Sequence, residues 1–577
     1  MKPLNELWSR LAQLSRKGPV MGEAQRFLLL SIIIGIFSGL IVVCFHMTIE
    51  FFNWNTVHGA GQRNWLVVLL WPAAGGGVAY LLTVHVFPSA RGSGVNFTKA
   101  ALYASDGYVP FNGVTGKFIA STISIGSGNP MGPEDPALQM GAGIASLLGR
   151  MFRLTRDNMR LIAPVGAAAG IGAAFNTPIT AVLFVMEEVV AEWSTGVLGS
   201  IVLSAVSAVV VTRWFLGDDP LYSVPDFALS SYWELFVYAA IGLLGGLLSA
   251  WFTRFVVGMR ARAISAPTAW KYALPVLAGL AVGAVGIRIP EILGAGYEGI
   301  DSALNDRYVW YFLLLLGALK MVSTAVCFSA GTPGGMFAPT LFIGAMLGGG
   351  IGGLAHEYLP LATSPASAYV LVGIGTFFAG VFRAPMTSIF MVFETSASYV
   401  IILPVMVSNT ISFLVSRQLQ HESLLQIVGR QDGLDLPSVE EAREAPRLSI
   451  EDAMRKGDQR VLRSDWSVSE ALERMRARGA ERTLVGAGWS DWTWIERGDL
   501  ESTVEAGQGA ESVAEALRPR SVIRVYPDQS LESALWLLGP YPILPVMSRV
   551  NPGLLLGTLT LEDVERAYGI GQDRSVQ

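Results

Sequence analysis

The stretch GSGNPMGPEDPALQMGAGIASLLG, residues 126–149, decides how this chain folds. It places two adjacent acids, Glu134 and Asp135, between Pro133 and Pro136, inside a region that is otherwise apolar. Proline is tolerated in the first turn of a helix, because the N–H groups there have no intrahelical partner. The stretch therefore predicts a helix that begins within an apolar region and carries carboxylates at its start.

The composition of the chain is that of a membrane protein. Of its 577 residues, 51% are hydrophobic and 15% are charged, and the mean hydropathy is +0.45. Soluble proteins carry about 25% charged residues. The run FLLLSIIIGIFSGLIVVCFHMTI from Phe27 stays uncharged for long enough to cross a bilayer, which takes about 20 residues, and comparable runs follow. We therefore expect an α-helical polytopic membrane protein.

The apolar runs stop near Val415, and the remaining sequence is polar and charged. We expect both termini in the cytoplasm and the protein in the cell membrane, because basic residues before the first span favour the cytoplasmic side. The expected segments are a cytoplasmic N-terminal segment, membrane repeat half 1, membrane repeat half 2, a linker and a tail, which are residues 1–26, 27–217, 218–420, 421–446 and 447–577.

The membrane region contains an internal repeat. SAGTPGGMFAPTLFIGA, residues 329–345, repeats the glycine and proline spacing of residues 126–142. GVFRAPMTSIFMVFET, residues 380–395, repeats AAFNTPITAVLFVMEE, residues 173–188, at nearly the same offset. Corresponding Gly/Pro-interrupted segments point to the binding site of a transporter-like fold. The alternative is that these residues only let helices pack closely.

A helix that begins inside a membrane presents unpaired N–H groups and the positive end of its dipole. Those donors must find a partner in lipid, and an anion is a suitable one that needs no lysine or arginine. The repeat supplies two such helix starts, one in each half. We expect both to face a single point and to hold a small anion there through weak contacts that allow it to leave again.

The acids of the first half suggest a gate and a proton path. Glu134 at a helix start is itself an anion that can occupy the site, and it can release the site when protonated. Glu187 has the repeat counterpart Glu394, so we expect both to do a shared structural job such as satisfying buried helix ends. Glu188 corresponds to Thr395 and is a candidate for a proton relay, or alternatively an acid at a solvated helix end.

Several other classes of protein are disfavoured. The two cysteines, Cys44 and Cys327, lie in apolar runs, and the five histidines are scattered, so we expect neither a disulfide nor a metal site. A membrane hydrolase would need a metal or nucleophile cluster beside its paired acids. We therefore expect no enzymatic activity, no required cofactor and no nucleic-acid partner.

These motifs resemble those of the CLC chloride channel and transporter family. STISIGSGNPMGPEDPALQMG resembles its GREGP signature, GTPGGMFAPTLFIGAMLGG its GxFxP element, and RGSGVNF its GSGIP element. The resemblance covers residues 20–430 in the order that the family has. It implies a CLC-type inverted repeat of tilted and broken helices, and a homodimer with one anion pathway in each subunit.

The resemblance also implies roles for individual residues. Ser93 and the backbone N–H groups of Met336 and Phe337 correspond to groups that coordinate the anion. Glu134 corresponds to the external gating glutamate of the family, which also accepts the proton. Glu188 corresponds to the internal proton-transfer glutamate, an acid that is typical of antiporters and that channels usually lack.

Four departures from the family pattern concern the same site. Pro133 replaces an arginine and removes one backbone donor. Asp135 replaces a glycine and adds a second carboxylate at the anion site, where two close acids should titrate together. A gap-free count places Leu425 where the family has a tyrosine that reaches the anion, and Asn96 replaces the proline of GSGIP.

The tail, residues 447–577, resembles a cytoplasmic α/β pair of CBS modules, about residues 447–505 and 516–570. Such pairs can bind an adenine nucleotide through a Thr-x-x-Asp motif, which the second module keeps as Thr560 and Asp563. The first module has Asp499 but carries Glu496 in place of the threonine. A structural or dimerising tail is therefore at least as well supported as a nucleotide sensor.

Together these features predict a membrane transporter of small inorganic anions, chloride first, that moves protons in exchange. The alternatives are a passive CLC-type anion channel and an antiporter for another anion such as nitrate, bicarbonate or fluoride. A receptor-like sensor would instead bind nucleotide without any flux. The sequence leaves the preferred anion and the coupling stoichiometry open.

Overall fold

The structure is a computed structural model of the chain. It divides into two compact units, Met1–Arg443 and Glu444–Gln577. Residues 421–434 and 436 of the predicted linker, residues 421–446, are described and contain α18 (Leu424–Gln431). The predicted N-terminal segment, residues 1–26, lies largely outside the described residues. These are residues 22–54, 64–190, 195–218, 222, 231–358, 364–434, 436, 448–457, 461–486, 492–516, 520, 522–551 and 554–568.

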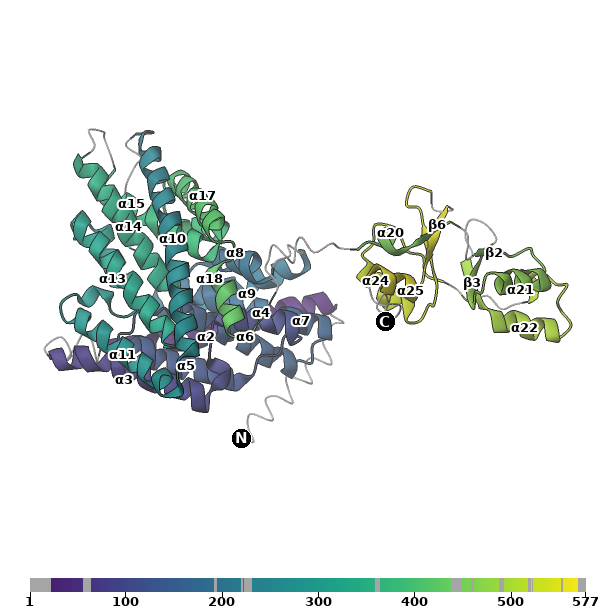
Figure 1. Cartoon of the computed structure of the whole chain (residues 1–577), viewed down its shortest axis with the longest axis horizontal. Coiled ribbons are helices and arrows are strands. Elements are labelled where there is room, and N and C mark those ends of the chain that lie inside the picture. The colour runs from purple at the N-terminus through teal and green to yellow at the C-terminus, as the bar shows by residue number, and fades with distance from the viewer. Residues whose placement is uncertain are drawn as a thin grey trace. The chain divides into compact units, whose positions relative to one another are not determined.

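The first unit is helical (Figure 1). Its first half contains α2 (Glu23–Asn53), α3 (Trp65–Leu81), η3 (Leu82–Val86), η4 (Pro88–Ala90), α4 (Gly94–Ala104), α5 (Phe111–Gly126), α6 (Glu134–Met151), α7 (Arg156–Phe175), α8 (Pro178–Phe184), η5 (Val185–Val190) and α9 (Thr195–Leu216). Its second half contains α10 (Glu234–Ser265), α11 (Thr268–Gly286), η6 (Pro290–Ile292), α12 (Tyr297–Leu304), α13 (Trp310–Ser329), α14 (Phe337–Tyr358), α15 (Ala366–Phe382), α16 (Pro385–Ser396), α17 (Ile402–Leu419) and α18 (Leu424–Gln431).

Eight of the described helices are long and apolar enough to cross a membrane, which confirms the prediction of a multi-pass membrane protein. The repeat is visible in how helices pack. In the first half α2 packs on α9 and α6 on α7, and in the second half α10 packs on α17 and α14 on α15. The halves join where α3 packs on α11 and α8 on α16.

Glycines bring the backbones of paired helices together in both halves. A Cβ atom on Gly141 of α6 would lie 2.1 Å from the carbonyl oxygen of Gly166 in α7. The corresponding Cβ atom on Gly344 of α14 would lie 2.2 Å from the carbonyl oxygen of Gly373 in α15. Some glycines of the repeat therefore serve close helix packing, as the alternative interpretation held.

Two acids cap helices across the boundary between the halves. Glu187 accepts hydrogen bonds from Met386 N at 3.2 Å, Thr387 N at 2.9 Å and Thr387 Oγ1 at 2.7 Å, at the start of α16. Glu394 accepts from Ile179 N at 2.9 Å and from Thr180 N and Oγ1, both at 2.6 Å, at the start of α8. The expected structural role of this pair is confirmed.

The second unit contains two small three-stranded sheets with helices. One sheet has the order β2-β3-β4, with β2 parallel to β3, and the other has the order β1-β6-β5. The strands are β1 (Arg455–Lys456), β2 (Val461–Arg463), β3 (Arg482–Gly486), β4 (Trp492–Glu496), β5 (Leu544–Met547) and β6 (Leu555–Leu559). The helices are α20 (Ile450–Ala453), α21 (Val468–Ala477), α22 (Arg497–Glu505), α23 (Val513–Ala516), α24 (Leu531–Leu538) and α25 (Leu561–Ala567).

The opening segment of this unit crosses to the second sheet. Strand β1 pairs antiparallel with β6, and Ile450 of α20 lies in the same apolar core as Leu531 and Val564. Val513 of α23 instead joins the core around the first sheet. The sheet β1-β6-β5 and its core therefore combine residues that precede and residues that follow the segment of the sheet β2-β3-β4. The two sheets thus do not correspond to two consecutive stretches of the sequence.

Candidate functional site

The two predicted helix starts meet. Gly132, just before α6, and Gly335, just before α14, exchange two backbone hydrogen bonds, each of 2.7 Å, as a short antiparallel bridge. Corresponding residues of the two halves are thus bonded to each other, and both helices begin directly after the bridge. The prediction that the two helix starts converge on one point is confirmed.

Glu134 lies at this convergence and is completely buried. Its Oε2 atom accepts a hydrogen bond of 3.3 Å from the backbone N–H of Ala338, in the first turn of α14. Its Oε1 atom accepts a hydrogen bond from the hydroxyl of Tyr297, the first residue of α12. The carboxylate at the start of α6 therefore accepts a hydrogen bond from a backbone amide at the start of α14, where the helix dipole favours negative charge.

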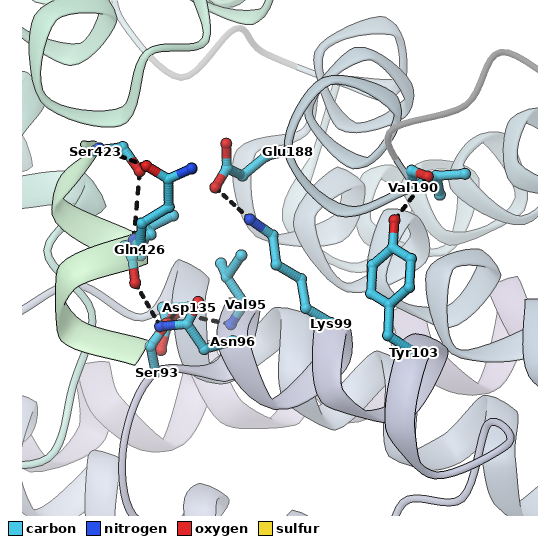
Figure 2. A network of polar contacts seen from close by, with 11 residues as sticks. Ser93, Val95, Asn96, Lys99, Tyr103, Asp135, Glu188, Val190, Ser423 and Gln426 are labelled. Atoms are coloured by element: carbon cyan, nitrogen blue, oxygen red, sulfur yellow. Dashed lines mark hydrogen bonds and ion pairs between the residues drawn. The ribbon is translucent and has the colours of Figure 1, made fainter. Parts of the chain in front are cut away.

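Asp135 is also buried, but its carboxylate goes to a third helix start, that of α4. Its Oδ1 atom accepts from Ser93 Oγ at 2.8 Å and from Val95 N at 3.2 Å (Figure 2). Its Oδ2 atom accepts from Gly94 N at 2.7 Å. The Nζ atom of Lys117 lies 3.9 Å from Oδ2. The hydroxyl that was predicted to coordinate the anion therefore donates to a protein carboxylate.

A small cavity of about 10 Å³ joins these groups. That volume is room for about one water molecule. The residues that line it include Ser93, Asp135, Met336 and Phe337, which are four of the predicted anion-site residues. Leu425 of α18 lines it too, so the position predicted for the missing tyrosine does reach this cavity. The carbonyl of Leu425 accepts a hydrogen bond of 2.8 Å from Asn96 Nδ2, which ties α18 to α4.

Glu188 lies in η5 and is buried, 6% exposed. Its Oε1 atom lies 2.6 Å from the Nζ atom of Lys99, which is 4% exposed and projects from α4 (Figure 2). The alternative of a solvated helix end is therefore wrong for this acid. Helix α4 contacts two acids of the first half that have no acidic counterpart in the second half, since its start holds Asp135 and its middle holds Glu188.

Two buried lysines repeat a single arrangement. Lys117 of α5 donates to the carbonyls of Gly92 at 2.6 Å and Ala90 at 3.4 Å, just before α4. Lys320 of α13 donates to the carbonyls of Gly294 at 2.7 Å and Ile292 at 2.9 Å, just before α12. Each lysine fixes the loop that leads into a short helix of the site. The separation in sequence between Lys117 and Lys320 equals the separation between the GPEDP and GMFAP stretches. This shared offset is the sequence signal that identifies the two lysines.

Two of the larger cavities that adjoin the helix starts differ in the charge of their lining side chains. A cavity of about 100 Å³ reaches Ser93 and is lined by four cationic side chains and, among the described residues, by no acid. A cavity of about 430 Å³ reaches Pro133 and Tyr297 and is lined by three glutamates and one histidine, without a described lysine or arginine. The cations are Arg91, Lys117, Arg260 and Lys271, and the others are Glu50, Glu291, Glu298 and His46. Glu134 lies in sequence between Pro133, which lines the 430 Å³ cavity, and Asp135, which accepts a hydrogen bond from Ser93 at the 100 Å³ cavity.

The candidate nucleotide residues of the tail act as helix caps. Asp563 Oδ2 accepts from Thr560 Oγ1 at 2.7 Å, and Asp563 Oδ1 accepts from Arg455 Nε at 2.8 Å. Asp499 accepts from Glu496 N at 3.0 Å and from Arg520 at 3.1 Å. These contacts give both aspartates a structural role, and nucleotide binding stays a prediction.

Sequence reasoning missed Tyr297, Lys99 and the two buried lysines. The Tyr297–Glu134 bond joins residues 163 positions apart, and the Lys99–Glu188 bond joins residues 89 positions apart. No local pattern of the sequence predicts either contact.

Comparison with known proteins agrees with this geometry. A family model described as voltage gated chloride channel matches residues 75–417. A putative chloride channel protein ClcB-like of Ralstonia nicotianae is 34% identical over 390 residues, 65% of this chain and 90% of the relative. The H+/Cl− exchange transporter ClcA of Vibrio campbellii is 27% identical over 432 residues, 71% of this chain and 92% of the relative.

The fold is found among solved structures as well. The crystal structure of a slow cyanobacterial Cl−/H+ antiporter superposes with a TM-score of 0.65 at 23% identity, over 72% of this chain and 99% of the other. The membrane unit therefore has the CLC-type fold. With the family match over more than half of its length, this chain belongs to the voltage gated chloride channel family, the CLC family.

Proposed function

We propose that this protein exchanges a small inorganic anion, chloride first, for protons across a membrane. The observation that carries the proposal is the carboxylate of Glu134 on the Ala338 amide, at the point where the two helix starts meet. The relative from Vibrio campbellii and the cyanobacterial structure are both named for exchange of chloride and protons.

The proposed mechanism follows from competition for one set of donors. An anion needs the helix-start amides that the Glu134 carboxylate occupies. A proton on Glu134 removes the charge that the helix dipole attracts, so the side chain leaves and the anion enters. Because the same residue carries the proton and closes the site, anion entry and proton movement are coupled. Glu188 is the proposed second proton carrier, and Lys99 is its ion-pair partner.

The test is paired chloride and proton flux in liposomes that contain the purified full chain. A chloride gradient should drive protons uphill through the wild-type protein, and Glu134→Gln should abolish proton movement while chloride still passes. Glu394→Gln is the matched control, because it neutralises a carboxylate of the membrane unit that caps α8 and makes no hydrogen bond to α6 or α14 among the described residues. Chloride flux without proton movement in the wild type would overturn the exchange proposal.

A passive anion channel is the second candidate. The observation in its favour is the aliphatic Leu425 at the small cavity, since its side chain supplies no hydroxyl to the anion. A reversal potential that follows the anion gradient alone would select the channel.

The remaining parts of the proposal concern assembly and the tail. We propose a homodimer with one pathway in each subunit, with both termini in the cytoplasm, because the chain resembles the family in its motifs.

The tail is proposed to be a CBS pair, and the support is that it contains two small sheets with helices, each with its own apolar core. Its proposed role is structural, because Asp563 and Asp499 are each engaged by an arginine, and adenine nucleotide is the ligand to test in a binding titration.

A further inference from the structure

The start of helix α4 is occupied by the chain's own carboxylate. Asp135, only 4% exposed, accepts three hydrogen bonds there, from Ser93 Oγ and Val95 N (Figure 2) and from Gly94 N. Ionised acceptors make hydrogen bonds about twice as strong as neutral ones. The donors are thus fully used by an anion that is covalently part of the protein.

The neighbouring cavity has too little space for a second anion. It holds about 10 Å³ between Ser93, Asp135, Met336 and Phe337. Chloride is larger than water, so it does not fit into this cavity between Ser93 and Met336 while Asp135 is in place. A free anion close to the carboxylate would also meet like-charge repulsion in a region of low dielectric.

The second half of the molecule lacks this acid. The repeat aligns Asp135 with Ala338, whose side chain is a methyl group and whose amide donates to Glu134. Lys117 and Lys320 repeat each other, so the acid is an addition to an otherwise shared arrangement. The 3.9 Å approach of Lys117 to Asp135 balances part of the added charge.

We propose that Asp135 is a tethered competitor of the transported anion, so that an anion reaches Ser93 only after the Asp135 carboxylate has left it. The inference rests on the proposed function and assigns Asp135 as the residue that sets anion affinity. Glu134 and Asp135 then form two adjacent gates on one helix start, the first on the amide of α14 and the second on the donors of α4.

The size of the effect follows from the fraction of molecules in which the position is open. An apparent dissociation constant equals the intrinsic constant divided by that fraction. If Asp135 leaves Ser93 in about one molecule in ten, removal of the acid strengthens chloride binding about tenfold. A carboxylate that only caps α4 predicts the opposite sign, because its loss would weaken the site or the fold.

The experiment measures chloride binding to the purified full chain by calorimetry, and the KM for chloride in liposome flux. Asp135→Asn keeps the shape of the side chain and one acceptor oxygen, and Asp135→Ser is a smaller uncharged second variant. Both should lower the dissociation constant and the KM for chloride about tenfold or more. Adding Ser93→Ala to Asp135→Asn should return binding towards the wild-type value, because the freed hydroxyl is then lost.

Equal chloride affinity in the wild type and in both folded variants would overturn the proposal. Failure of both variants to fold would also overturn it, since Asp135 would then be a structural cap. Proton movement by the wild type, measured in parallel, separates this outcome from failure of the exchange proposal. Tighter chloride binding by Asp135→Asn without wild-type proton movement would leave Asp135 as a competitor in a channel.

Discussion

The two halves of the membrane unit share a frame but differ in charge at the centre. Both use glycine contacts between paired helices, a buried lysine under a short helix, and an acid that caps a helix of the opposite half. Only the first half places acids at its broken helix, and the aligned residues of the second half are Phe337 and Ala338. The residues that the two halves share thus form the common helical framework, here called the frame, and the residues that differ between the halves form the candidate site.

The asymmetry makes the halves complementary. The first half offers the carboxylate of Glu134, and the second half offers the backbone amide of Ala338 to receive it. Carboxylates on both helix starts would repel each other, and a methyl and a phenyl group on both would leave nothing to carry a proton. Substitutions at aligned positions therefore distinguish residues that stabilise the shared frame from residues that take part in transport.

The aligned lysines should differ most in stability. Lys320→Met removes charged hydrogen bonds to carbonyls, each worth about 1.5–3 kcal/mol. Lys117→Met also leaves the buried Asp135 without the Lys117 ammonium, and breaking a buried pair costs about 3–5 kcal/mol. We expect a larger fall in unfolding free energy for Lys117→Met, measured by tryptophan fluorescence in detergent. Equal losses would show that the Lys117–Asp135 contact contributes nothing.

The aligned positions 188 and 395 should differ in proton transport. Glu188→Gln should lower proton flux roughly a hundredfold, the low end of what a positioned proton-transfer group supplies. Thr395→Val should leave it unchanged, because Thr395 Oγ1 donates to carbonyls of its own helix, those of Met391 at 2.7 Å and Val392 at 3.4 Å. Proton flux in liposomes decides, and an unaffected Glu188→Gln would remove this residue from the proton path.

Tyr297 tests the gate from the side of the second half. Tyr297→Phe removes the hydroxyl that donates to Glu134, and a hydrogen bond to a charged group is worth about 1.5–3 kcal/mol. The gate should therefore open more readily, and chloride exchange should accelerate about tenfold with the proton ratio unchanged. Tyr308→Phe is the control, because Tyr308 lines the same 430 Å³ cavity. A slower Tyr297→Phe variant would mean that the hydroxyl assists transport.

The capping acids should behave alike and show the smallest effect. Glu187→Gln and Glu394→Gln each weaken one helix cap, which costs about 1 kcal/mol. Both should lower the unfolding free energy by similar amounts and leave the ratio of chloride to protons unchanged. A change in that ratio for either variant would place the residue in the transport path and break the division between frame and chemistry.

The sequence predicted the frame better than the contacts. The glycine and proline spacing predicted both helix starts and their convergence, and the match of Glu187 with Glu394 predicted their shared role. Position alone could not show that the Asp135 carboxylate turns to Ser93, because that depends on side-chain direction across 42 residues of separation. Neither Lys117 nor Lys320 was predicted as a site residue, although their alignment at the offset of the repeat is present in the sequence.

Anomalous diffraction from bromide-soaked crystals of the full chain tests the central claim most directly. If Glu134 competes with the transported anion at the joined helix starts, Glu134→Gln crystals should show bromide beside the Ala338 amide, and wild-type crystals should show none at that position. Bromide at that place in both proteins, or no bromide near Ala338 in the variant, would contradict the account.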